Sequence, residues 1–187
     1  MKLDTNKAWL EGVRRNPSPH CDDRPNGAEI DLLVIHGISL PPGQFGGPFI
    51  DQLFTHSLDK DAHSYFVDIA HLRVSAHLLI RRTGEVVQYV SFQQRAWHAG
   101  VSSFAGRERC NDFAIGIELE GCDDVPYTDE QYEQLAQVIG ILREAWPVLT
   151  KERIVGHSDI APGRKTDPGP AFDWERLSVI SYQESKL

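Results

Sequence analysis

The stretch of residues 153–170 constrains the fold of this chain more than any other. Three prolines and three glycines interrupt it, so neither a long helix nor a central strand is expected to run through it. An irregular loop of this kind needs something to hold it, and a bound metal ion is the economical candidate. The loop offers His157 and, ten positions on, Asp167, with Lys165 beside them.

Two predicted strands lead into histidines. The apolar run at residues 30–35 ends at His36, and residues 153–156 return as a strand that ends at His157. Open α/β sheets bind ligands at such strand ends. With Asp167 these histidines make two imidazoles and a carboxylate, a set suited to Zn²⁺, since catalytic zinc sites use three protein ligands and keep one position open. Spacing alone leaves open that the three residues are unrelated.

The strict alternation of residues 113–120 predicts a further strand with one apolar face. Its other face carries small residues and two acids, which leaves room for a cleft above the sheet with Glu118 at its edge. Glu120 is expected to face solvent. Trp97 and His98, in a glycine-ended loop, are candidates for the part of the cleft that binds a sugar or peptide substrate, with a plain packing role as the alternative.

The remaining elements define the fold class. A hairpin is predicted at residues 76–81 and 85–90 around Thr83-Gly84, and one long helix from Thr128, with Gln131 completing a capping box, to Pro147. Short helical pieces are expected at residues 49–54 and 65–72, and a loop at 40–48. We therefore predict one α/β domain over residues 1–187, a mixed sheet flanked by helices, with residues 1–29 as an extended lead-in that wraps it and carries no evident chemistry.

Composition limits the kinds of binding partner and the cellular compartment that we expect. The net charge is -8 and no run of Lys or Arg exceeds two residues, which argues against nucleic acid. No stretch approaches the ~18 apolar residues of a membrane span, and the chain as given shows no secretory signal. The three cysteines form no C-x-x-C pair, as expected of free thiols in a reducing cytoplasm. A monomer is expected.

Long motifs spread over the chain carry a resemblance to a known family, at residues 34–43, 73–77, 95–100, 106–113, 116–121 and 153–170. From Trp9 to about Leu177 the chain resembles the AmpD family of cytoplasmic N-acetylmuramoyl-L-alanine amidases. The resemblance implies the fold of peptidoglycan-recognition proteins, and hydrolysis of the lactyl amide that joins 1,6-anhydro-N-acetylmuramic acid to L-alanine of the stem peptide. In members of the family, this activity belongs to peptidoglycan recycling and also restrains β-lactamase induction.

The same resemblance implies roles for individual residues. It places one zinc ion per chain on His36, His157 and Asp167, with Glu118 as the acid and base and Lys165 stabilising the oxyanion. Two more residues match family positions that face the acidic stem peptide, Arg73 and Arg109.

The chain departs from the family at some positions. Gly37 stands where Asn is common, which removes one expected substrate hydrogen bond, and Ser158 stands where Cys is common. Ala76 replaces the tyrosine of related phage-type amidases, which leaves Glu118 as the acid/base. Two rival functions remain for this fold: a non-catalytic muropeptide-binding module and a lytic amidase of the intact wall.

Overall fold

A six-stranded mixed sheet forms the centre of the protein, in the order β12-β5-β11-β6-β7-β3. The computed structural model describes residues 1–183 of the chain. Four neighbouring strands run parallel, β7 is antiparallel to β6, and β3 lies parallel to β7 at the edge. The bounds are β12 (Ile154–Gly156), β5 (Leu32–Ile38), β11 (Ala114–Glu120), β6 (Leu78–Ile80), β7 (Val86–Gln88) and β3 (Arg14–Arg15). The predicted mixed sheet with flanking helices is confirmed.

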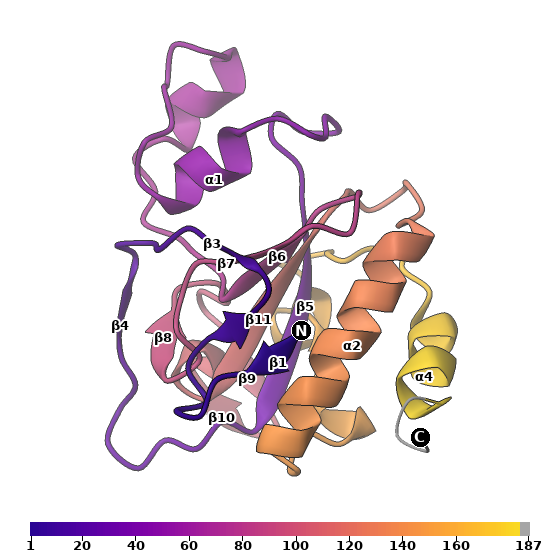
Figure 1. Cartoon of the computed structure of the whole chain (residues 1–187). Coiled ribbons are helices and arrows are strands. Elements are labelled where there is room, and N and C mark those ends of the chain that lie inside the picture. Colours follow the sequence, from indigo (N-terminus) through magenta and orange to yellow (C-terminus); the bar gives the residue numbers. More distant parts are fainter. Residues whose placement is uncertain (184–187) are drawn as a thin grey trace.

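Both faces of the sheet are covered, and its inner strands are therefore buried on both sides. Helices α2 (Asp129–Ala145) and α4 (Trp174–Gln183) lie side by side over one face (Figure 1). The other face packs against α1 (Phe49–Phe54) and η1 (Ser64–Asp68) at one end and against α3 (His157–Ile160) at the other. Because every residue of β11 is buried, any polar side chain on it needs a partner inside the protein.

The elements with strong local signals are where they were predicted. Thr128 caps α2, and its hydroxyl and the Gln131 side chain complete the capping box. The hairpin forms between β6 and β7, with Gly84 at a φ of 81° in its turn, although both strands are shorter than predicted. Helix α1 matches the expected residues 49–54.

Several boundaries differ from the prediction. Strand β5 continues to Ile38, so His36 lies inside the strand. His157 starts the one-turn helix α3. Its single turn is closed by the hydrogen bond from Ala161 N to His157 O at 3.0 Å, and Pro162 follows directly. Of the expected helical piece at residues 65–72, only residues 65–68 are helical, as part of η1. Arg153 belongs to η3 (Lys151–Arg153) and not to β12. Helix α4 is an element that the sequence patterns do not predict.

The first 29 residues contribute strands of their own. A small antiparallel pair joins β1 (Lys2–Leu3) to β2 (Leu10–Glu11), and β4 (Cys21–Asp23) pairs with β8 (Gln94–Ala96). The short elements β9 (Ser103–Phe104), β10 (Arg107–Glu108) and η2 (Cys110–Asp112) lie between β8 and β11 in the chain. Within residues 1–183, no helix is long and apolar enough to cross a membrane.

Candidate active site

Parallel pairing of β5 with β12 brings the two predicted histidine ligands together. Ile35 and Gly156 are partners in the register, and the residues that follow them in the chain are His36 and His157. Asp167 reaches the same point from the loop after α3, where its carbonyl accepts a hydrogen bond from Ser158 N at 3.0 Å. Its carboxylate accepts from Gly37 N at 3.4 Å.

Three donor atoms converge in this arrangement. His36 Nδ1 lies 2.9 Å from His157 Nδ1 and 3.3 Å from Asp167 Oδ2, and His157 Nδ1 lies 3.1 Å from the same oxygen. A tetrahedral zinc ion with bonds of about 2.0–2.2 Å separates its ligand atoms by about 3.4 Å. The three residues are also the one group of potential metal ligands found among the described residues. Donor chemistry and spacing therefore fit zinc.

The ionisation states suit metal binding as well. Burial lowers the pKa of His36 to about 4, although the nearby carboxylate of Asp167 opposes the shift. Burial alone would raise the pKa of Asp167, but its close contacts with His157 and His36 outweigh burial and hold this pKa well below its usual range. The site thus presents a neutral imidazole and a carboxylate, the forms that bind a metal.

Glu118 stands next to His36 across the sheet, since the two are partners in the register of β11 with β5. Its Oε2 atom is buried and has no hydrogen-bond partner among residues 1–183. Burial raises the pKa of Glu118 well above its usual value, the charge of Asp167 raises it further, and Lys165 opposes both. A buried, unpaired carboxyl of this kind is suited to carry a proton.

One cavity of about 650 Å³ collects most of the predicted site residues. The metal trio and Glu118 line it together with Lys165, Trp97 and His98. Arg73 does not line this cavity, and its side chain is exposed. Arg109 lines a separate hollow and pairs with Asp112 at 3.3 Å.

Gly37 is explained by a neighbour that the sequence did not reveal. A Cβ atom at this position would lie 2.4 Å from the hydroxyl of Tyr127, which donates to Pro168 O at 2.9 Å. Tyr127 therefore fills the space that a side chain at position 37 would need.

The expectation of a solvated Glu120 is wrong. This residue is 2% exposed, and its carboxylate accepts hydrogen bonds from Gly46 N at 2.7 Å and Arg82 N at 3.2 Å. Arg81 adds an ion pair at 3.4 Å. Glu120 is buried because both faces of β11 are covered. Its hydrogen bond to Gly46 holds the loop at residues 40–48, part of which forms a wall of the cavity.

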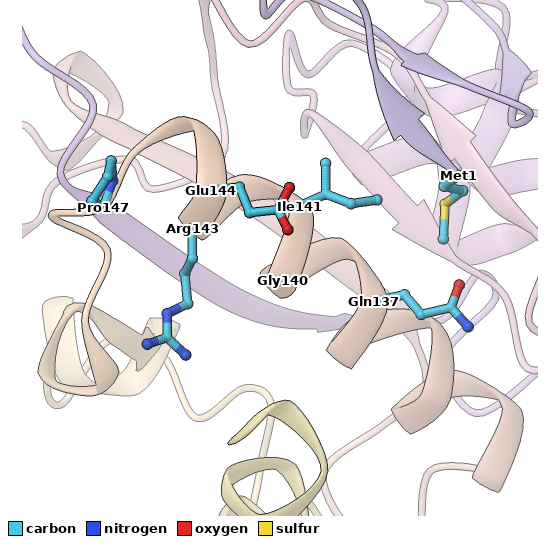
Figure 2. Close-up of a pocket in the computed structure, with 7 residues that line it drawn as sticks. All are labelled: Met1, Gln137, Gly140, Ile141, Arg143, Glu144 and Pro147. Atoms are coloured by element: carbon cyan, nitrogen blue, oxygen red, sulfur yellow. The ribbon is translucent and has the colours of Figure 1, made fainter. Parts of the chain in front are cut away.

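A further hollow lies beside α2 and is unrelated to this chemistry (Figure 2). Met1, Pro147 and residues of α2 line it, and these include one carboxylate, Glu144, but no histidine or cysteine. Its helical residue Gly140 has no neighbour near the position of a Cβ atom. With no convergent polar groups, this hollow does not compete as the active site.

Comparison with known proteins agrees with this geometry. Residues 26–170 match the N-acetylmuramoyl-L-alanine amidase family, and the chain belongs to that family. Within it, the 1,6-anhydro-N-acetylmuramyl-L-alanine amidase AmpD of Escherichia coli K12 is 62% identical over 179 residues, which cover 96% of this chain and 97% of the relative. The resemblance to AmpD is confirmed.

Solved structures extend the comparison to three dimensions. A crystal structure of a selenomethionine derivative of AmpD superposes with a TM-score of 0.92 at 61% identity, covering 96% of this chain and 99% of that one. AmpDH3 from Pseudomonas aeruginosa, in complex with anhydromuramic pentapeptide, superposes with a TM-score of 0.60 at 28% identity, covering 96% of this chain and 66% of that one.

Proposed function

We propose that this amidase hydrolyses the lactyl amide bond between 1,6-anhydro-N-acetylmuramic acid and L-alanine of a soluble stem peptide, with one zinc ion. The observation that carries the proposal is the convergence of His36, His157 and Asp167 beside the unpaired carboxyl of Glu118 in one cavity. The names of the AmpD relatives, and the anhydromuramic pentapeptide bound by AmpDH3, support the choice of substrate.

The chain's own residues divide the work of hydrolysis. His36, His157 and Asp167 would hold the zinc ion, which would act as a Lewis acid on the amide carbonyl and lower the pKa of the attacking water toward about 7. Glu118 takes the proton of the attacking water and delivers it to the departing alanine amine, a role worth about 10²- to 10⁴-fold. Lys165, which lines the same cavity, stabilises the negative charge that develops on the carbonyl oxygen.

The state of the cysteines supports a cellular compartment for the reaction. All three cysteines are free, and unpaired thiols are typical of a reducing compartment. We therefore assign the enzyme to the cytoplasm as a recycling amidase, acting as a monomer on a soluble muropeptide.

One assay on two substrates tests the proposal. Purified, zinc-saturated protein is given a soluble 1,6-anhydromuropeptide or intact sacculi, and the release of stem peptide is measured. We expect rapid release from the soluble substrate and slow release from sacculi. A comparable rate on sacculi would make the protein a lytic amidase, and no release from either would make it a binding module.

Two variants test the residue roles in the same assay. Glu118→Ala should abolish turnover while zinc stays stoichiometric, and Asp167→Ala should weaken zinc binding itself. Glu144→Ala, which removes an exposed carboxylate of α2, is the matched control and should change neither. Retained activity in Glu118→Ala would remove this residue from the mechanism.

A further inference from the structure

One dipeptide contacts the outer nitrogen of both histidine ligands. His36 Nε2 lies 2.9 Å from His98 Nδ1, and His157 Nε2 lies 3.2 Å from Ala99 O. These contacts come from consecutive residues, on a segment far in sequence from either ligand. The opposite nitrogen of each imidazole, Nδ1, is the one that faces Asp167.

The contact with Ala99 dictates the tautomer of His157. A carbonyl oxygen only accepts hydrogen bonds, so Nε2 of His157 must donate, and the Nδ1 atom of the neutral ring then keeps a lone pair. For His36 the requirement comes from the proposed metal: zinc at Nδ1 needs a lone pair there, so the proton of the neutral ring must lie on Nε2, where His98 Nδ1 can accept it. Outer contacts of this kind orient metal-binding imidazoles and fix their tautomers.

The dipeptide is itself held in place from two sides. The side-chain oxygen of Asn111 accepts hydrogen bonds from His98 N at 3.1 Å and from Ala99 N at 2.8 Å. On the sheet side, a Cβ atom at Gly116 would lie 2.4 Å from the His98 ring, so the absence of a side chain there gives the ring its space. Arg164 Nη2 donates to the carbonyl of Ala99 at 2.6 Å.

We propose that His98 and Asn111 are positioning residues for the metal centre: Asn111 sets the His98-Ala99 dipeptide, and the dipeptide holds both histidine ligands with Nδ1 directed at the metal. This inference rests on the proposed zinc site and deepens it. It also gives His98 a role other than the contact with substrate predicted from the sequence.

Zinc affinity is the measurement that tests this role. The dissociation constant is determined on metal-free protein by competition with a chromogenic chelator, and the absorption bands of the Co²⁺-substituted protein report ligand geometry. His98→Leu and Asn111→Ala should each weaken zinc binding by about 10- to 100-fold and should shift the Co²⁺ bands. Circular dichroism confirms that each variant is folded.

Conservative and distant variants separate positioning from a general structural effect. His98→Asn and Asn111→Asp each keep an acceptor oxygen near the original atom and should restore most of the affinity. His71→Leu and Asn26→Ala remove exposed side chains of the same types and should leave the affinity unchanged.

The outcomes distinguish this inference from the proposed function. Wild-type protein that binds zinc tightly, with His98→Leu and Asn111→Ala binding it equally tightly, would overturn the positioning role alone. Wild-type protein that binds no zinc would overturn the proposed metal site and the inference with it.

Discussion

Replacing Arg24 with methionine should lower the free energy of unfolding by about 4 kcal/mol. The Arg24 guanidinium donates hydrogen bonds at 3.0–3.2 Å to four backbone carbonyls, which belong to two separate stretches of the chain. The acceptors are Phe92, Asn111, Asp112 and Ala114. Burial lowers the pKa of Arg24 to about 10, so the group stays charged at neutral pH and its hydrogen bonds remain charge-assisted.

The magnitude follows from the number of these bonds. Each is worth at least about 1 kcal/mol net, the value of a hydrogen bond between neutral groups. Methionine fills much of the volume of the arginine stem but leaves all four carbonyls without this donor. A loss of about 4 kcal/mol is a large share of the 5–15 kcal/mol that stabilise a typical domain. For a chain of this size, it corresponds to a fall in the melting temperature of about 8–16 °C.

Urea unfolding of the metal-free protein, followed by tryptophan fluorescence, measures this loss. Arg15→Met is the matched control, because Arg15 lies in the same N-terminal segment with an exposed side chain and makes one long bond, 3.4 Å to Leu10 O. It should cost less than about 1 kcal/mol. If the two variants were equally stable, the four carbonyl bonds of Arg24 would contribute nothing measurable and the reasoning would be refuted.

Three further perturbations test the site. Burial raises the pKa of Glu118 above its value in the unfolded chain, so ionisation of this group destabilises the fold as the pH rises above about 4.5. The metal-free Glu118→Gln variant should therefore unfold at a higher urea concentration than wild type at pH 7.5, and at the same concentration at pH 4. A difference that does not depend on pH would contradict this. Gly37→Asn should cost about 1–3 kcal/mol in the same unfolding assay, and adding Tyr127→Phe should recover part of it because the hydroxyl blocks the new side chain; no recovery would place the strain elsewhere. Lys165→Met should reduce turnover by about 10²- to 10³-fold at unchanged zinc content, and full activity would exclude the oxyanion role.

Short-range patterns in the sequence were sufficient for the long helix, the hairpin and the central strands. The capping box of Thr128 and Gln131 involves residues three apart, and the alternation along residues 114–120 needs no knowledge of the neighbouring strands. The expected sheet also placed His36 and His157 at one edge, since parallel strands end together. Motifs over most of the chain then indicated the family and the role of Glu118.

Other features could not be predicted from the sequence, because they depend on which faces of the sheet other elements cover. The alternation around Glu120 resembles that of a half-exposed strand, but helices and loops pack on both faces of β11, and its carboxylate became an internal anchor for the loop at residues 40–48. Arg24 lies in a polar, proline-containing lead-in with no periodicity, and nothing local indicates that its side chain enters the protein.

By itself, then, the sequence indicated the long helix, the hairpin, the central strands, the class of fold and the amidase family. Only the tertiary structure decided how the site is supported. His98 and His36 are 62 positions apart, Arg24 and Ala114 are 90 apart, and Tyr127 meets Gly37 across the fold. Such contacts depend on the strand register and on which elements pack on the sheet, and a local sequence pattern does not predict them.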